Sequence, residues 1–386
     1  MKTVLLAWEL GEGYGHLTTL KPFVDKLIEQ NIKTVLVVRD VVKAEEVFSK
    51  KNVTILQAPF FPESLSLKTN SIVSNYSDIL ALFGFDDVDS LFAMTSAWEN
   101  IFQIVDPDYI IADHSPTASL AAMGRIPTAI VGNGFTVPPV HLNEFPSLRP
   151  DLQPIIPQLK ILRNIREVQK KRNRYVPDVI TEIVKGDDRL IFTYPDLDPY
   201  NHIRNELVHG PVGIMPKPSL ITFDTNMFVY CSANYSGIEE LCLGLINIKI
   251  PVSVYVRGRA KVLTSFLKTK GIKIYNKPPD LTQVLPKTSV VLSHAGSGMS
   301  HAALAAGRPQ ILLPRHLESS LSARALKNLG VATVIPKMTD TSLEWAVEHT
   351  CEDLKKRDHA YKCAEEAKKK EYPDGVALLL EKIIKH

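Results

Sequence analysis

The feature that most constrains the fold lies in residues 290–314, where strand, turn, helix and strand patterns follow one another. The apolar run 290–292 leads into His294 and a turn of small residues, and residues 300–306 are rich in alanine. Gly307 stands where helices commonly end, and a second apolar run, 311–313, stops at Pro314. This order predicts a parallel sheet covered by helices, the α/β class.

The turn before the predicted helix has the composition of an anion site. The backbone N–H groups of Ser297, Gly298 and Met299 are expected to lie unpaired at a helix N-terminus, where the helix dipole is positive. Small residues such as Gly296 allow an anion to approach the backbone closely. The alternative is an ordinary strand-to-helix turn in which His294 is satisfied by local hydrogen bonds.

Strand and helix patterns alternate through the whole chain, which at 386 residues is too long for one ordinary core. Strands are expected at 4–8, 35–38, 53–57, 109–112, 128–131 and 227–231. Glycines and prolines between 210 and 218 suggest a boundary. We therefore expect one domain over residues 1–212, a second over 213–370, and a terminal helix over 371–386.

Charge and cysteine content exclude several classes of protein. The formal net charge of +3 gives no general case for nucleic-acid binding. The four cysteines have no metal-like spacing and are expected to be free thiols in a reducing compartment, the cytoplasm. Glu9 and Glu12 interrupt the first apolar run too early for a signal peptide, and no run is long enough for a membrane span. No metal site and no cofactor is expected.

The first strand ends in the turn Gly11-Glu-Gly-Tyr-Gly15-His16, which opens directly into a helix pattern. A dinucleotide fingerprint is one interpretation, but its last glycine is replaced by His16. A catalytic base is another, because the positive end of a helix keeps an imidazole neutral and able to accept a proton. A local capping role for His16 remains open.

A histidine base commonly has a carboxylate that orients it, and Asp113 is the best candidate. Asp113 ends the strand 109–112, at the edge where sites gather in parallel sheets. The alternative is an aspartate of an ordinary turn. The neighbouring His114 is expected to be a loop residue without a chemical role.

Residues 278–330 resemble the nucleotide-diphosphate motif of GT-B glycosyltransferases in the superfamily of UDP-glucuronosyltransferases and macrolide glycosyltransferases. The positions in register are His294, Gly296, Gly307, Pro309, Pro314, Glu318 and Ala323. The resemblance implies a divergent bacterial-type member with the GT-B fold, two Rossmann-like domains facing across a cleft. It also implies that the last helix crosses back to the first domain, and that His16 and Asp113 are the base and its partner.

The resemblance further implies which residues bind a nucleotide-diphosphate sugar, the expected co-substrate. The donor set is Ser232, Tyr275, His294, Gly296, Ser297, Gly298, Met299, Glu318 and Ser319. Two positions depart from the family pattern. Ala302 stands where the family has a ribose-binding glutamate, and Ser319 where it has a sugar-binding glutamine. Tyr275 is expected to substitute for an aromatic residue that stacks on the base.

The acceptor is expected to bind an apolar pocket in the first domain that includes Phe60, Phe61 and Phe83, since this part varies most within the family. The basic stretch 160–174 is expected to be a solvated amphipathic helix. A patch for an anionic acceptor or a peripheral membrane contact is the alternative for it. Oligomeric state is not predicted.

Together these patterns predict an inverting, metal-independent glycosyltransferase that moves a sugar to a hydroxyl of a small or lipid-like molecule. Alternatives are a GT-B relative with other nucleotide-sugar chemistry, such as an epimerase, and a non-catalytic nucleotide- or ligand-binding protein. A dehydrogenase is disfavoured by His16 in place of glycine.

Overall fold

The structure is a computed structural model, and it describes residues 2–61, 73–222, 224–258, 260–339, 341–351 and 353–385. The chain divides into two compact units. Unit 1 contains Met1–Thr193, Asp198–Gly213 and Tyr372–His386, and unit 2 contains Tyr194–Leu197 and Ile214–Glu371. The sequence-based boundaries differ at Tyr194–Leu197, which belong to unit 2 because Tyr194 packs edge-on against His301, with ring centroids 5.5 Å apart.

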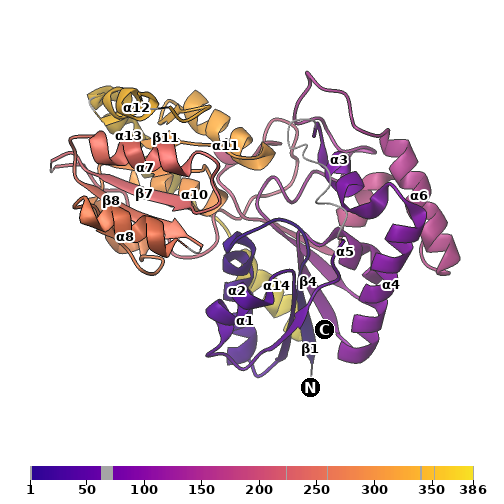
Figure 1. Ribbon diagram of the computed structural model, residues 1–386. Helices are drawn as coiled ribbons and strands as arrows, with labels where there is room; N and C mark the ends of the chain where they lie inside the picture. The colour runs from indigo at the N-terminus through magenta and orange to yellow at the C-terminus, as the bar shows by residue number, and fades with distance from the viewer. Residues whose placement is uncertain are drawn as a thin grey trace. The chain divides into compact units, whose positions relative to one another are not determined.

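Unit 1 is built on a six-stranded parallel sheet with the strand order β3-β2-β1-β4-β5-β6. Figure 1 labels its two central strands, β1 and β4. Its strands are β1 (Thr3–Trp8), β2 (Lys33–Val38), β3 (Thr54–Gln57), β4 (Tyr109–Asp113), β5 (Thr128–Gly132) and β6 (Asp188–Ile191). All residues of β1, β4 and β5 are buried, as expected for central parallel strands covered on both faces.

Helices cover both faces of this sheet. The helices of unit 1 are α1 (Gly15–Glu29), α2 (Val41–Phe48), α3 (Tyr76–Leu80), the π-helix η2 (Ala81–Phe85), α4 (Val88–Val105), α5 (Pro116–Ala122), α6 (Gln158–Lys171), η3 (Ile180–Val184) and α14 (Gly375–Lys385). Apolar side chains of α1, α2 and α14 share one core with the sheet, and those of α4 and α5 share the other. The last helix of the chain is therefore part of the first unit.

Unit 2 repeats the pattern with the strand order β12-β11-β10-β7-β8-β9, again parallel. Its strands are β7 (Met227–Ser232), β8 (Val252–Arg257), β9 (Lys273–Ile274), β10 (Val290–Ser293), β11 (Gln310–Leu312) and β12 (Ala332–Val334). The turn after β10 leads into a helix that ends at Gly307, as the sequence predicted. Gly307 has a φ of 73°, the left-handed conformation in which glycine ends helices.

The helices of unit 2 are η4 (Pro195–Leu197), α7 (Ile238–Asn247), α8 (Lys261–Thr269), α9 (Leu281–Val284), η5 (Leu285–Lys287), α10 (Ser297–Ala306), α11 (Leu317–Asn328), α12 (Ser342–Cys351) and α13 (Leu354–Lys369). The main core lies between the sheet and helices that include α7 and α12. A smaller core lies between the sheet and α10. Within the described ranges, no helix is both long enough and apolar enough to span a bilayer.

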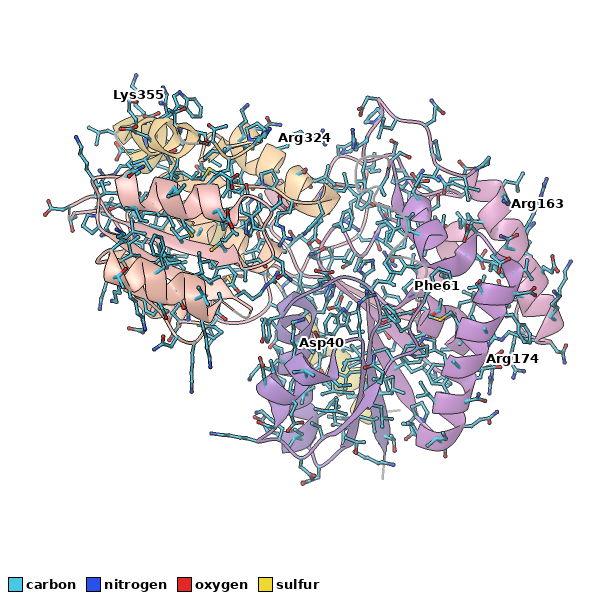
Figure 2. All side chains as sticks on the ribbon, in the orientation of Figure 1. Asp40, Phe61, Arg163, Arg174, Arg324 and Lys355 are labelled. Carbon is cyan, nitrogen blue, oxygen red and sulfur yellow. The ribbon has the colours of Figure 1, made fainter. Side chains whose placement is uncertain are left out.

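The basic stretch 160–174 is mostly helix α6, whose apolar side chains Ile161, Ile165 and Val168 are buried. Arg163 is exposed and projects outward from this helix (Figure 2). Arg172 and Arg174, just past the helix, both bind Glu99 of α4, at 3.0 and 2.7 Å. The predicted amphipathic helix is thus present, and a peripheral membrane contact through its exposed basic side chains stays a prediction.

Candidate functional site

The ends of β1 and β4 bring the predicted base and its carboxylate together in unit 1. β1 and β4 are neighbours, with Trp8 opposite Asp113, so the helix that follows β1 starts beside the end of β4. His16 lies in the first turn of α1, and its Nδ1 is 3.1 Å from Oδ2 of the buried Asp113. This distance permits a hydrogen bond that fixes the imidazole with Nε2 directed away from the carboxylate.

The turn between β1 and α1 fits closely around the imidazole of His16. The indole of Trp8 stacks on it, with ring centroids 5.2 Å apart. Gly11 has a φ of 85°, and a β-carbon at this position would clash with Nε2 of His16. Position 11 therefore requires glycine for two reasons. Its backbone conformation is unfavourable for other residues, and the imidazole of His16 leaves no room for a side chain.

His114 is the residue of this site that the sequence analysis missed. It is 7% exposed, its φ is 47°, and neither ring nitrogen has a hydrogen-bond partner among the described residues. Its ring lies 5.8 Å from that of His16 and 5.9 Å from that of Tyr76. Burial lowers the pKa of His114 well below its usual value. A neutral imidazole with unused polar atoms beside His16 is able to bind a polar ligand group.

The three predicted acceptor-site aromatics come together at one depression in unit 1, which encloses no space large enough for a water molecule. Its walls are Glu9, Leu10, Arg39, Pro59, Phe60, Phe61, Phe83 and Met94. The carboxylate of Glu9 is turned toward α5, where Oε2 accepts a hydrogen bond of 3.1 Å from the N–H of Thr117. Burial raises the pKa of Glu9 to about 7, although these hydrogen bonds oppose the shift.

In unit 2, the N-terminus of α10 has the form of an anion site. Ser297, Gly298 and Met299 are its first three residues, so their N–H groups have no partner within the helix. Gly296 is the capping residue and supplies no side-chain hydrogen bond. A β-carbon at Gly296 or Gly298 would meet no atom within 4 Å, so the backbone here is open to a ligand.

His294 has a different set of partners from the one predicted. Its Nδ1 lies 3.0 Å from the carbonyl oxygen of Leu313, and its Nε2 accepts a hydrogen bond of 3.2 Å from the N–H of Ser232. The imidazole thus joins the ends of three neighbouring strands, β7, β10 and β11. Burial lowers its pKa to about 4. Both nitrogens are engaged by the backbone, so the predicted hydrogen bond from His294 to a diphosphate requires one of these bonds to open.

Two arginines that the sequence analysis did not single out lie near this edge of unit 2. Arg257 is paired with Ser232 in the sheet, and Arg315 donates a hydrogen bond of 3.0 Å to the carbonyl of Asn234. Both arginines, together with His316, contribute to lowering the pKa of His294. Their positions in the sequence could have identified these arginines as candidate site residues. Arg257 is the last residue of a strand, and Arg315 follows Pro314, where the next strand pattern stops. Their charge adds to the positive end of α10.

The other predicted donor residues lie on separate elements of unit 2. Glu318 is in the first turn of α11, and Tyr275 follows β9, with its ring 5.9 Å from that of Phe228. Ser319 is fully buried, and its hydroxyl accepts hydrogen bonds from the N–H groups of Arg315 and His316. The hydroxyl also donates to the carbonyl of His316, so it is occupied in capping α11. Contact between Ser319 and a sugar remains a prediction.

Ala302, which stands in place of the family glutamate, is 2% exposed and lies in the apolar core beneath α10. It offers no hydrogen-bonding atom to a ribose. A glutamate here would place a carboxylate among apolar side chains, a costly arrangement. Among the described residues, no three His, Cys, Asp or Glu side chains are grouped as a metal site.

Two six-stranded parallel sheets, each carrying a polar site at the carboxyl ends of its strands, define the GT-B class of fold. Solved structures match it over nearly the whole chain. Spinosyn rhamnosyltransferase SpnG complexed with thymidine diphosphate has a TM-score of 0.67 at 13% identity, over 99% of this chain and 100% of that one. Glycosyltransferase VinC in complex with DTDP has a TM-score of 0.65 at 13% identity, over 100% of this chain and 99% of that one.

Sequence similarity is concentrated in part of the chain. Residues 270–383 match the family described as "Erythromycin biosynthesis protein CIII-like, C-terminal domain". A 61-residue segment is 43% identical to elloramycin glycosyltransferase ElmGT from Streptomyces olivaceus, covering 15% of this chain and 16% of that protein. A 72-residue segment is 33% identical to UDP-sugar-dependent glycosyltransferase 52 from Dictyostelium discoideum, covering 19% of this chain and 4% of that protein. The matches thus span less than a fifth of either relative's length.

The resemblance predicted from the sequence is confirmed. The chain has the GT-B fold throughout, and its residues 270–383 are similar in sequence to the C-terminal domain of a macrolide glycosyltransferase family.

Proposed function

We propose that the protein is an inverting glycosyltransferase that moves a sugar from a nucleoside-diphosphate donor to a hydroxyl group of a small acceptor. The observation that carries this proposal is the pairing of His16 with Asp113 at 3.1 Å, at the carboxyl ends of two adjacent parallel strands. A buried carboxylate on Nδ1 favours the tautomer in which Nε2 is free of a proton and can accept one.

The donor's diphosphate would bind at the first turn of α10, through the N–H groups of Ser297, Gly298 and Met299. The same donors would stabilise the negative charge that develops on the departing diphosphate. Arg257 and Arg315 support this assignment, because they add positive charge at the same edge of the sheet. Glu318, in the first turn of α11, would accept hydrogen bonds from the sugar.

In the proposed reaction, the acceptor oxygen attacks the anomeric carbon and the carbon–oxygen bond to the diphosphate breaks in the same step. The acceptor proton passes to Nε2 of His16, and the bond electrons leave with the nucleoside diphosphate. A single displacement of this kind inverts the configuration at the anomeric carbon. We propose that no metal ion takes part, because N–H groups and arginines can supply the charge stabilisation.

A thymidine-diphosphate sugar is the donor we favour. Ala302, buried in the apolar core where the family has a ribose-binding glutamate, cannot recognise a ribose 2′-hydroxyl, so a deoxyribose should bind no less well than a ribose. Two structural relatives were solved with thymidine diphosphate. Calorimetry should find thymidine diphosphate bound at least as tightly as uridine diphosphate. A strong preference for the uridine form would mean that another residue holds the ribose.

We propose a cytoplasmic location, since all four cysteines are free thiols and three of them are buried. A reducing compartment keeps them in this state.

The proposed function is tested by incubating the full chain with thymidine- and uridine-diphosphate sugars and a set of hydroxylated acceptors, with products identified by mass spectrometry. We expect an acceptor product heavier by one sugar residue, nucleoside diphosphate released in equal amount, and unchanged turnover after exhaustive chelation. Diphosphate binding without transfer to any acceptor would indicate a non-catalytic relative, and an interconverted sugar nucleotide would indicate an epimerase.

A further inference from the structure

Three arginines of unit 1 converge on a single oxygen atom of Glu99, in helix α4. Nη1 of Arg125 lies 2.8 Å from Oε1 of this glutamate. Nη2 of Arg172 and Nε of Arg174 lie 3.0 and 2.7 Å from the same atom. Arg125 follows α5, and the other two arginines follow α6, so the cluster joins three helices. Because all three guanidinium groups contact one oxygen atom, they also lie close to one another.

This arginine cluster carries more positive than negative charge. Burial opposes the ionisation of Glu99, but the hydrogen bond from Arg174 and the charge of Arg172 lower its pKa below the usual value, so Glu99 is charged at neutral pH. Within the described ranges, no other carboxylate lies within ion-pair distance of these arginines. Three cations and one anion leave two positive charges uncompensated, and like charges at such short range repel one another.

The turn that follows α6 holds the arginine cluster in place. Gln169, in the last turn of α6, is fully buried, and its Oε1 accepts a hydrogen bond from Nη1 of Arg172. Its Nε2 donates a hydrogen bond of 2.8 Å to the carbonyl of Tyr175, and its own carbonyl accepts one of 2.9 Å from the N–H of Arg174. The guanidinium groups are therefore positioned before any ligand binds, which lowers the entropic cost of binding.

Two of the three arginines can be reached from solvent. The side chains of Arg125 and Arg174 are 37% and 30% exposed, whereas that of Arg172 is 2% exposed. Nη2 of each exposed arginine makes no hydrogen bond to the part of the chain that the structure describes. Figure 2 labels Arg174 on the side of unit 1 where α4 and α6 lie. An anion could thus contact the two exposed guanidinium groups, with the charge of Arg172 beneath them.

The arginine cluster and the predicted base lie at opposite edges of the sheet of unit 1. Asp113 is the last residue of β4, at the carboxyl edge of the sheet. Arg125 precedes β5, which starts at Thr128 and runs parallel to β4, so this arginine lies at the amino edge. A ligand of the cluster is therefore neither the donor nor the acceptor of the proposed reaction.

We propose that Arg125 and Arg174 form a binding site for a phosphate group, with Arg172 supplying positive charge from beneath. A phosphomonoester carries a charge of about −1.5 to −2 at pH 7, which matches the two uncompensated positive charges. The planar fork of an arginine side chain also matches the spacing of phosphate oxygens. A free phosphate compound and the headgroup of phosphatidic acid share this chemistry. The site goes beyond the proposed function, because it takes no part in sugar transfer.

The test is a calorimetric titration of the full chain with inorganic phosphate and, for comparison, with acetate. Both titrations use the Gly298→Glu background, in which the added carboxylate repels anions from the N-terminus of α10. Phosphate should bind at least tenfold more tightly than acetate. Adding Arg125→Met and Arg174→Met together should weaken phosphate binding at least tenfold.

The matched control is Lys160→Met combined with Arg163→Met, which removes two positive charges from exposed positions of α6 outside the cluster. Figure 2 labels Arg163 on this helix. If the cluster is the site, this control should bind phosphate as the background does. An equal loss of affinity in the control and in the cluster variant would overturn the proposal, because it would indicate a general attraction to a basic surface. Equal affinity for phosphate and acetate would overturn it as well.

Vesicles that contain phosphatidic acid distinguish a lipid source of the phosphate from a free one. Binding to these vesicles that depends on Arg125 and Arg174, without binding of free phosphate, would support the site with a lipid headgroup as its ligand. Vesicle and phosphate binding that are both unchanged in the cluster variant would overturn the proposal. If that variant fails to fold by circular dichroism, Arg125→Met alone, which leaves Glu99 two arginine partners, should still weaken phosphate binding at least threefold. None of these measurements requires sugar transfer, so their outcome is independent of the proposed function.

Discussion

Two imidazoles in unit 2, those of the half-buried His294 and the buried His301, are held in the neutral form. Burial lowers the pKa of His294 to about 4 and that of His301 to about 4, against an ordinary value of 6.5. In the unfolded chain both rings take up protons near pH 6.5, whereas in the folded chain they resist protonation until about pH 4. Their contribution to stability is therefore present above pH 6.5 and is lost as the pH falls toward 4.

We predict that His294→Gln reduces this pH dependence, because glutamine does not titrate. Between pH 6.5 and 4.5, the free energy of unfolding of the wild type should fall by about 1–2 kcal/mol more than that of the variant, a figure reduced for the partial exposure of the ring. Urea titrations of both proteins at several pH values measure this difference. Parallel pH profiles would show that His294 is not held neutral by the fold.

The N-terminus of α10 can be tested by placing a charge on it. Gly298→Glu puts a carboxylate at the second position of the helix, where open space accepts the side chain and the dipole favours a negative charge by about 0.3–1 kcal/mol. We predict that this variant is at least as stable as the wild type but binds thymidine diphosphate at least tenfold more weakly.

Gly298→Gln is the matched control for this experiment, with the same size and no charge. Calorimetry should find its diphosphate affinity close to that of the wild type and well above that of the glutamate variant. Equal affinities for the glutamate and glutamine variants would place the diphosphate away from this helix.

Sequence patterns predicted the helices and strands well where their formation depends on residues that are close together in the chain. Buried strands such as β1 and β10 were evident from their apolar runs, and the pairing of His16 with Asp113 followed from two strand ends at one edge of a parallel sheet. Contacts that depend on packing could not be predicted. The stacking of Arg39 on Phe60 joins residues from different loops, and the burial of His114 follows from a left-handed backbone that no sequence pattern specifies.

The donor residues show the same limit. The sequence predicted the open turn at α10, because small residues before a helix are recognisable. It did not predict that the imidazole of His294 would be occupied by Ser232 and Leu313, since the two partners lie 62 and 19 residues away in the chain. The sequence also did not predict the capping role of Ser319, whose hydroxyl donates a hydrogen bond to the carbonyl of His316 in the same turn.

The integrity of unit 1 depends on both ends of the chain. Leu379 of α14 is 3% exposed and belongs to the core shared with β1 and α1, whereas the adjacent Leu378 is 55% exposed. We predict that Leu379→Ala lowers the free energy of unfolding by about 2–5 kcal/mol, the usual range for a buried leucine. Leu378→Ala should change it by less than about 0.5 kcal/mol. Equal effects in chemical denaturation would show that α14 does not pack in this register.

The two halves of the proposed chemistry are carried by different units, with the base in unit 1 and the diphosphate site in unit 2. Loss of the base should therefore leave donor binding intact. This separation allows the chemical step to be removed without disturbing the donor site.

The most direct measurement of the central claim is the turnover number of His16→Ala in sugar transfer, with donor affinity measured calorimetrically on the same preparation. The account predicts a loss of about a hundredfold or more in turnover with unchanged donor affinity, the usual scale for removing a general base. Asp113→Asn should show a smaller loss, because this carboxylate orients the imidazole rather than taking the proton. Turnover near the wild-type level in His16→Ala would contradict the account.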